Sequence, residues 1–285
     1  MRYRAATAAQ WISVFLKTCA GLLGCCALMP AAQAQTPSPM AEWQYSGGQV
    51  LASRYEKTPE WQAELGLGME ELPRYPGASK YRFQPAPTFD FHYRDIAFAS
   101  VGEGLGVNFT EGHSHRIGMA ITYNLGREEH SDPHLHGLGN INPAPELKFF
   151  GEYVIFPLVL RADIRRGFGG YNGWIGDFSA YLPVVGNDKF FLLVGPSITF
   201  ADSHYQQRFF GITAAQSASS VYAPYSAGGG LSNASFGANA TWFITDHWFL
   251  EGLASAQRML GSSFNSPLVD AHGQYSGGVF INYMY

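Results

Sequence analysis

Side chains along most of this chain alternate between apolar and polar with a period of two. Near the C-terminus, Tyr275, Val279 and Ile281 fall on one face, while Gln274 and Asn282 fall on the other. Successive side chains of a β-strand point to opposite faces, so the pattern predicts strands. The alternating segments run about 9 to 13 residues, whereas strands of soluble sandwiches average about 5 or 6 and tilted membrane strands need about 9 to 11. The pattern therefore favours a transmembrane barrel over a soluble sandwich.

Composition excludes two other classes of protein. The chain is 46% hydrophobic and 14% charged, which is too apolar and too weakly charged for a disordered protein. After residue 35 no apolar run approaches the roughly 18 residues that a spanning helix needs. The longest such run, Val154–Leu160, is interrupted by Pro157. A helical membrane protein is therefore also excluded.

We predict an all-β fold, a closed antiparallel transmembrane β-barrel of about twelve strands, with ten strands as the alternative. The strands are expected at 61–70, 84–94, 95–102, 104–110, 115–126, 143–153, 156–167, 171–184, 189–200, 228–244, 245–258 and 273–285. Aromatic residues gather at the ends of these segments, as in the interfacial girdles of such barrels. The last residue, Tyr285, is typical of the C-terminal signal that the barrel-assembly machinery recognises.

Four of the six odd-numbered connections between these strands are long, and the even-numbered ones are all tight. Outer-membrane barrels have short periplasmic turns and longer external loops, so long and short connections should alternate. We expect a periplasmic N-terminus, tight even-numbered turns, and external odd-numbered connections at Glu71–Phe83, Gly102–Gly104, Gly126–Asn142, Gly167–Gly170, Ala201–Ala227 and Met259–His272. An even number of strands also returns the C-terminus to the periplasm.

The N-terminus resembles an export signal. Arg2 and Arg4 begin a basic region, Thr18–Met29 is apolar, and Ala32-Gln33-Ala34 offers the small residues that signal peptidase needs. We predict cleavage after Ala34 and hence an outer-membrane location. The predicted parts are a signal peptide (1–34), a periplasmic N-terminal segment (35–60) and the barrel (61–285). Leu22–Cys25 resembles a lipobox and leaves lipidation at Cys25 as the alternative.

Cleavage after Ala34 would remove all three cysteines, Cys19, Cys25 and Cys26, together with three basic residues. The remaining 251 residues (285 minus 34) would hold 15 Lys and Arg (18 minus 3) against 22 Asp and Glu, a net charge of −7. A cysteine-free exported protein cannot use disulfides, so its stability must come from a large core or a closed sheet. The negative balance argues against nucleic acid as a partner.

The polar face of the predicted strands carries many charges, and in a barrel this face lines the lumen. Buried charges must be paired or hydrated, and their mixed signs favour paired charges over a strongly ion-selective pore. The candidate lumen charges are Asp90, His92, Arg94, Glu146, Lys148, Glu152, Arg161, Asp163 and Arg165.

We predict no catalytic, cofactor-binding or metal site, and hence no enzyme. His130, His134 and His136 have a spacing that could bind a metal weakly, but they are more simply interpreted as solvated loop histidines. The serine at position 197 lies upstream of His204, but no Gly-x-Ser-x-Gly motif is present. A serine hydrolase is therefore not favoured.

Several short motifs resemble the MipA/OmpV family when they are taken in order. Gly195–Tyr205 followed by Phe210–Ile212 resembles its central signature, and Ala215–Ser217 and Tyr222 continue it. The remaining matches are Pro73–Ser79, where Ala78 departs from the expected glycine, Leu135–Gly139 and Ser266–Val269. The resemblance spans about residues 60–285. It implies an outer-membrane barrel.

The resemblance also implies a role in the cell envelope. It points to a scaffold in murein maintenance that bridges a lytic transglycosylase and a penicillin-binding protein; a small porin-like solute channel and a surface adhesin are the alternatives. Outer-membrane lipid and the barrel-assembly machinery are further expected partners. Because the periplasmic turns are short, the candidate for partner docking is the segment Gln35–Glu60, with Trp43, Tyr45 and Tyr55 as the contact residues. A disordered leader or a plug of the lumen is the alternative interpretation of this segment.

Overall fold

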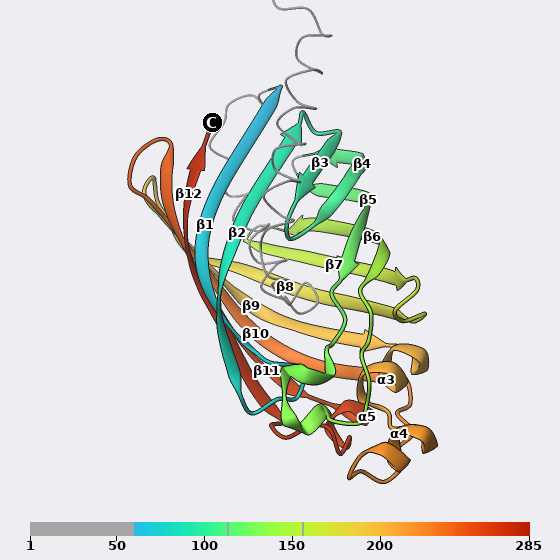
Figure 1. The fold of residues 1–285 in the computed structure, drawn as a ribbon. Helices are drawn as coiled ribbons and strands as arrows, with labels where there is room; N and C mark the ends of the chain where they lie inside the picture. The colour runs from blue at the N-terminus through green and yellow to red at the C-terminus, as the bar shows by residue number, and fades with distance from the viewer. Residues whose placement is uncertain (1–59, 113, 156) are drawn as a thin grey trace, which may run out of the picture. The chain divides into compact units, whose positions relative to one another are not determined.

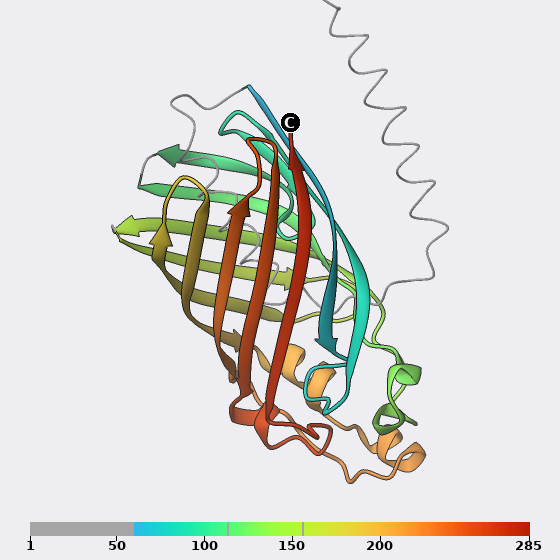
Figure 2. The same ribbon diagram turned by 90° about the vertical axis from the view of Figure 1, so that its left-hand side faces the viewer.

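The computed structural model describes residues 60–112, 114–155 and 157–285, which fold as a twelve-stranded antiparallel β-barrel (Figures 1 and 2). The barrel predicted from the sequence is confirmed. The strands are β1 (Trp61–Pro73), β2 (Tyr81–Tyr93), β3 (Ala97–Ser100), β4 (Gly104–Gly112), β5 (His115–Asn124), β6 (Ala144–Ile155), β7 (Leu158–Gly167), β8 (Trp174–Gly186), β9 (Phe190–Ala201), β10 (Gly230–Phe243), β11 (Trp248–Met259) and β12 (Gly273–Met284).

Each strand pairs with its neighbours in the chain, and β1 pairs with β12 to close the barrel. The period-two pattern sets which side chains face lipid. On β12, Tyr275, Val279 and Ile281 are exposed, whereas Gln274 and Asn282 are buried in the lumen. The apolar face of the pattern is therefore the lipid-facing face, and the polar face lines the lumen.

The third strand differs from the prediction. β3 has four residues, whereas the sequence pattern extended it over 95–102. Its turn, Val101–Glu103, is followed by Gly104 at φ +87°, and a Cβ there would lie 2.3 Å from the Ile121 carbonyl oxygen. The turn reaches only the level of Phe89 on β2, whose carbonyl accepts a hydrogen bond from Val101 at 3.2 Å. The connection predicted to be external therefore lies within the wall.

The long external connections contain short helices that the sequence pattern did not indicate. They are η1 (Glu129–Ser131), η2 (Pro133–Leu135), α3 (Ser203–Phe210), α4 (Ala214–Ser219) and α5 (Gly261–Phe264). Local capping explains two of them. The Asp202 carboxylate accepts the Tyr205 N–H at 2.8 Å, and Thr213 with Gln216 forms a capping box at α4.

None of the helices in the described parts of the chain has the length and apolar character needed to cross a membrane.

These connections pack together as an external cap, which we define as residues 74–80, 125–143, 168–173, 202–229 and 260–272. Its core is apolar and comes from segments far apart in the chain. One cluster joins Tyr75, Leu135, Ile212 and Leu268, all at most 2% exposed. A second cluster around Tyr205 and its neighbours seats the cap on the ends of β8 and β11. The cap therefore has the packed interior of a small soluble domain.

Candidate functional site

The lumen holds a belt of buried charges centred on Glu103, which enters from the short β3–β4 turn. Its carboxylate accepts a hydrogen bond from Arg116 of β5 at 3.0 Å and a second from Arg161 of β7. The Lys148 ammonium of β6 lies 4.0 Å away. All four side chains are at most 3% exposed. The Glu103 carboxylate thus connects the β3–β4 turn to three successive strands, β5, β6 and β7.

The belt continues over β6, β7 and β8. Arg161 lies 3.9 Å from the Glu152 carboxylate, and Arg165 Nε lies 3.1 Å from Asp163. A second guanidinium nitrogen of Arg165 donates to Asp177. Carboxylates and guanidinium groups alternate here, so the belt is a network of pairs and not a row of one sign.

Aromatic rings support the cations of the belt. The Arg116 guanidinium lies 4.6 Å from the ring centre of Phe98 and 4.7 Å from that of Phe150. Such distances are typical of cation–π contact. The ring pair holds Arg116 in place beside Glu103.

The β11, β12 and β2 part of the lumen has a different chemistry. Glu251 of β11 accepts hydrogen bonds from the amides of Asn239 at 2.8 Å and Asn282 at 3.5 Å. On β2, Asp90 lies 2.8 Å from the His92 ring. This side therefore holds its carboxylates largely through amides and one histidine, whereas the β5–β8 side uses arginine and lysine.

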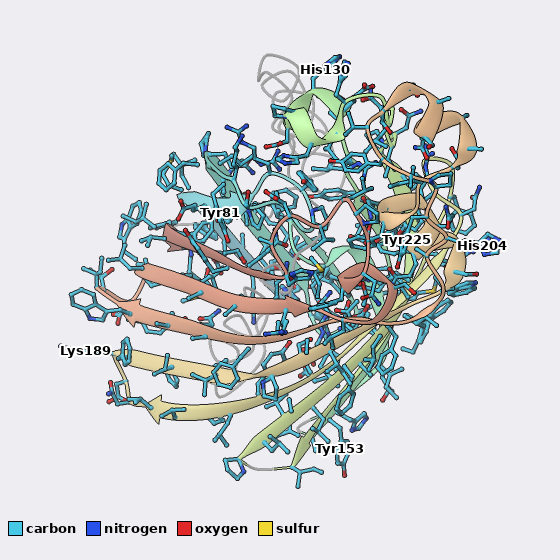
Figure 3. The ribbon with its side chains drawn as sticks, turned by 90° about the horizontal axis from the view of Figure 1, so that it is seen from below. Tyr81, His130, Tyr153, Lys189, His204 and Tyr225 are labelled. Carbon is cyan, nitrogen blue, oxygen red and sulfur yellow. The ribbon has the colours of Figure 1, made fainter. Side chains whose placement is uncertain are left out.

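Polar contacts as well as apolar ones hold the cap together. Buried Arg127 donates to the Phe209 carbonyl at 2.8 Å, and burial with the neighbouring charge of Arg208 lowers its pKa to about 10. Tyr75 donates to the Leu268 carbonyl at 3.2 Å. Its burial, together with the nearby Asp132 carboxylate, raises the pKa of the Tyr75 hydroxyl. Figure 3 shows the cap end-on, with His130 and Tyr225 in it and Lys189 at the far ends of the strands.

The structure brings eight of the nine candidate lumen charges into the barrel interior. They are Asp90, His92, Glu146, Lys148, Glu152, Arg161, Asp163 and Arg165. The ninth, Arg94, requires correction. It follows the end of β2 at φ +49°, which turns the backbone out of the strand alternation, and its side chain is half exposed beside Glu60 at 2.8 Å. Trp43, Tyr45 and Tyr55 lie outside the described residues.

Sequence reasoning missed the centre of the belt. Glu103 lies in a turn, where strand periodicity assigns no face, so nothing in the pattern indicated it. Arg116 could have been found from the pattern, because it lies two residues before Gly118 and so belongs to the lumen-facing series of Gly118, Ala120 and Thr122.

The loop histidines and the Ser197–His204 pair, which the sequence analysis considered as possible sites, lie in separate parts of the molecule. His134 lies 3.0 Å from Asp132, while His136 points toward Glu129 at 3.7 Å. Within residues 60–285, apart from 113 and 156, no group of three or more His, Cys, Asp or Glu side chains is placed to hold a metal ion. The Ser197 hydroxyl accepts from Ser179 at 2.9 Å inside the lumen, whereas His204 is largely exposed on α3.

The motifs that carry the family resemblance gather in and around the cap. Tyr75, Leu135, Ile212 and Leu268 come from four of these motifs and pack in one cluster. Gly137 has φ +83°, and a Cβ there would lie 1.9 Å from the Ser219 carbonyl oxygen. The glycine of the Leu135–Gly139 motif thus lets two loops approach closely.

Comparison with protein families matches the model described as "MltA-interacting protein MipA" over residues 65–285. Among curated proteins, none matches the chain.

Solved structures with a similar course of the chain are bacterial barrels. They include OmpF of Salmonella typhi in complex with daunomycin (9% identity, TM-score 0.35, 78% of this chain and 57% of that one). Others are a FadL homologue of Pseudomonas aeruginosa (9% identity, TM-score 0.40, 79% and 89%) and the translocator domain of the autotransporter NalP from Neisseria meningitidis (13% identity, TM-score 0.38, 89% and 99%). The chain spans a little over half the length of the OmpF chain.

Proposed function

Because the chain belongs to the MipA family, we propose that it is a scaffold in murein maintenance that bridges a lytic transglycosylase and a penicillin-binding protein. The closed barrel with its lipid-facing apolar surface makes the protein an outer-membrane barrel. The observation that carries the scaffold role is the family match over residues 65–285, since the family is described by its interaction with MltA. Export by cleavage after Ala34 is part of the same proposal.

Murein enzymes would meet this barrel at its periplasmic rim, where the connections are short. In one of these turns, for example, the Thr245 backbone N–H donates to the Trp248 carbonyl at 3.1 Å. Such turns offer little surface to a partner. Glu60, which directly precedes β1, lies at this rim, where it accepts hydrogen bonds from the Arg94 backbone at 3.0 Å and from the Arg94 side chain at 2.8 Å. We therefore assign partner docking to residues 35–60, with Trp43, Tyr45 and Tyr55 as the contact residues.

Affinity capture from solubilised envelopes tests this role. Tagged chain lacking Thr36–Pro59, and the triple variant Trp43→Ala, Tyr45→Ala, Tyr55→Ala, should fold but lose a lytic transglycosylase and a penicillin-binding protein that the unaltered chain retains. The matched control is Val221→Ala, which alters a 93% exposed side chain on the cap. Equal recovery of both enzymes with all four proteins would contradict the docking role of this segment.

A channel is a second candidate, favoured by the charged lumen. Single-channel steps in planar bilayers would support it, and their absence would favour the scaffold. Because the belt side chains Arg116 and Arg161 meet at Glu103 in the lumen, we expect any conductance to be small.

Surface adhesion is the third candidate, favoured by the ordered cap. Replacing residues 214–222 with a short Gly-Ser linker should then reduce the adhesion of whole cells in a surface-binding assay. Unchanged binding would remove this candidate.

A further inference from the structure

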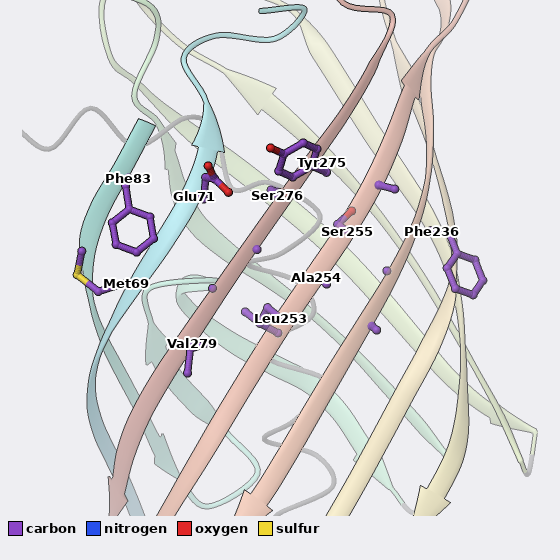
Figure 4. A pocket seen from close by; sticks show the side chains of 15 residues that line it. Met69, Glu71, Phe83, Phe236, Leu253, Ala254, Ser255, Tyr275, Ser276 and Val279 are labelled. Atoms are coloured by element: carbon purple, nitrogen blue, oxygen red, sulfur yellow. The ribbon is translucent and has the colours of Figure 1, made fainter. Parts of the chain in front are cut away.

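The lipid-facing surface of the barrel carries a groove whose floor includes β11. The groove has a volume of about 640 Å³ and extends from β10 over β11, β12 and β1 to Phe83 of β2 (Figure 4). Along β11 its floor is formed by Ala256 and Ala254, which lie two residues apart on the lipid-facing side of the strand. The wall therefore leaves free space on the side that meets lipid.

Larger side chains of the two neighbouring strands form walls on both sides of this floor. Ala256 lies opposite Phe236 of β10 and opposite Tyr275 of β12. Both aromatic side chains are about half exposed, and their strands are about 10 Å apart, which is twice the strand spacing. Next along β11, Ala254 lies opposite Gly277 of β12, so the floor continues past the two rings without a large side chain. An acyl chain can pass between the rings and bury its apolar surface on this floor.

A carboxylate lies at the outer end of the groove on β1. Glu71 lines the groove and lies opposite Phe83 of β2 and Gly277 of β12. Just outward of it, Tyr81 and Tyr275 stack on each other with ring centres 4.2 Å apart, and Figure 4 shows Glu71 beside Tyr275. Among the described residues, no hydrogen bond or ion pair reaches the Glu71 carboxylate. A charge on a lipid-facing surface needs water or an opposite charge.

A guanidinium group lies at the outer end of the groove on β11. Arg258 lies two residues beyond Ala256 on the same exposed face, opposite Gly273 of β12. Its guanidinium is 5.9 Å from the ring centre of Phe264 in the cap. No carboxylate in the described parts of the chain forms an ion pair with it. Arg258 and Glu71 thus flank Tyr275 on β11 and β1 as two opposite charges, and neither has a counter-charge.

These two charges match a zwitterionic head group. Phosphatidylethanolamine carries one phosphodiester and one primary ammonium group, so it has one partner for Arg258 and one for Glu71. Phosphatidylglycerol would leave the Glu71 carboxylate unpaired, and lipid A would bring two phosphate groups to a single cation. Tyrosine is enriched at the membrane interface where head groups lie, and Tyr275 lies between the two charges.

We propose that this groove binds one glycerophospholipid of the phosphatidylethanolamine class, held in the outer leaflet. Its phosphate pairs with Arg258 and its ammonium group with Glu71. One of its acyl chains lies over Ala256, between Phe236 and Tyr275. This role is separate from the scaffold role and does not depend on it.

The test uses the purified full chain in nanodiscs of phosphatidylglycerol that contain a small fraction of phosphatidylethanolamine with a diazirine in one acyl chain. After illumination, mass spectrometry gives the ratio of labelling in the groove to labelling on the lipid-facing side of β7, at Ala162 and Ile164. This ratio should be at least about tenfold higher than the ratio for a phosphatidylglycerol probe. Equal ratios for the two probes, or an equally high ratio for a lipid A probe, would overturn the choice of head group.

Three variants separate the contacts of the head group from those of the acyl chain. Glu71→Gln and Arg258→Gln should each lower the ratio for phosphatidylethanolamine about tenfold, because each removes a charge-assisted contact. Ala254→Phe should fill the floor and bring the ratio down to that of the phosphatidylglycerol probe. The matched controls, which should keep the high ratio, are Glu60→Gln at the opposite rim, Arg166→Gln at the outer end of β7 and Ala162→Phe on its lipid-facing side.

Heat-modifiable gel migration checks that each variant is folded. If Ala254→Phe does not fold, the two charge variants decide the result. An unchanged ratio in folded Glu71→Gln or folded Arg258→Gln would overturn the assignment of the head group. Dimers of the chain in native gels that Ala254→Phe converts to monomers would assign the groove to a second copy of the chain, which would also overturn the proposal.

Discussion

The external cap and the lumen belt are both buried, yet they are held by opposite kinds of interaction. The cap packs Tyr75, Leu135 and Leu268 in an apolar core, while the belt packs Arg116 and Glu103 as charges. The difference follows from the surroundings. A strand in the wall gives its apolar side chains to lipid and leaves the polar ones for the lumen, whereas the loops meet water and can bury their apolar side chains among themselves.

The largest effect should come from breaking the belt. Glu103→Ala leaves Arg116, Arg161 and Lys148 without the carboxylate they share, and removing one partner of a buried ion pair costs about 3–5 kcal/mol. Denaturant unfolding of the detergent-solubilised barrel measures this loss. Glu60→Ala is the control because the Glu60–Arg94 pair is exposed, and surface pairs contribute only about 0–1 kcal/mol. Equal losses in the two variants would show that burial does not distinguish these pairs.

The second effect concerns the cap alone. Leu135→Ala removes a fully buried side chain and should lower the stability of the cap by about 2–5 kcal/mol. The loss should be measured as faster amide hydrogen exchange in residues 74–80, 125–143 and 202–229. Exchange in the strands should stay unchanged. Val221→Ala, at a 93% exposed position, is the control and should change stability by less than about 0.5 kcal/mol. If exchange rose equally in the strands, the cap and wall would form one cooperative unit.

The smallest effect is the pH response of the cap. Burial would raise the pKa of the Asp132 carboxyl, but hydrogen bonds from the backbone and ring of His134, together with the charge of Lys80, prevail and lower it. A carboxyl whose pKa is lowered by folding stabilises the folded state above its unfolded pKa of about 3.9, and that stabilisation is lost as the pH falls through the lower, folded value. Below about pH 4, amide exchange in the cap, corrected for its intrinsic pH dependence, should therefore rise.

Asp132→Asn is the matched variant for this response. It should weaken the cap by about 1 kcal/mol at neutral pH and remove most of the change below pH 4. A variant that kept the full pH response would assign it to another carboxyl.

The belt shows how far strand periodicity reaches. Lys148, Arg161 and Asp163 were assigned to the lumen because each lies on the polar side of a regular alternation, and the strands keep that alternation. The prediction that Arg94 faces the lumen was wrong because Arg94 lies one residue beyond β2, where φ +49° ends the alternation. Glu103 could not be assigned at all, since its position depends on where a turn stops inside the wall.

The cap shows a second limit. Sequence motifs such as Leu135–Gly139 and Ser266–Val269 were recognisable, but their packing against one another joins residues more than a hundred positions apart. Nothing local indicates that contact.

The sequence by itself determined the barrel, a count of about twelve strands with ten as the alternative, the lipid-facing side of the regularly alternating strands, and the position of the long connections. These features depend on side-chain alternation and on connection length, which are local properties of the chain. Only the tertiary structure decided that Glu103 joins three strands and that the loops form a cap with an apolar core. Each of these depends on which distant segments meet, and loop contacts carry no period from which that could be inferred.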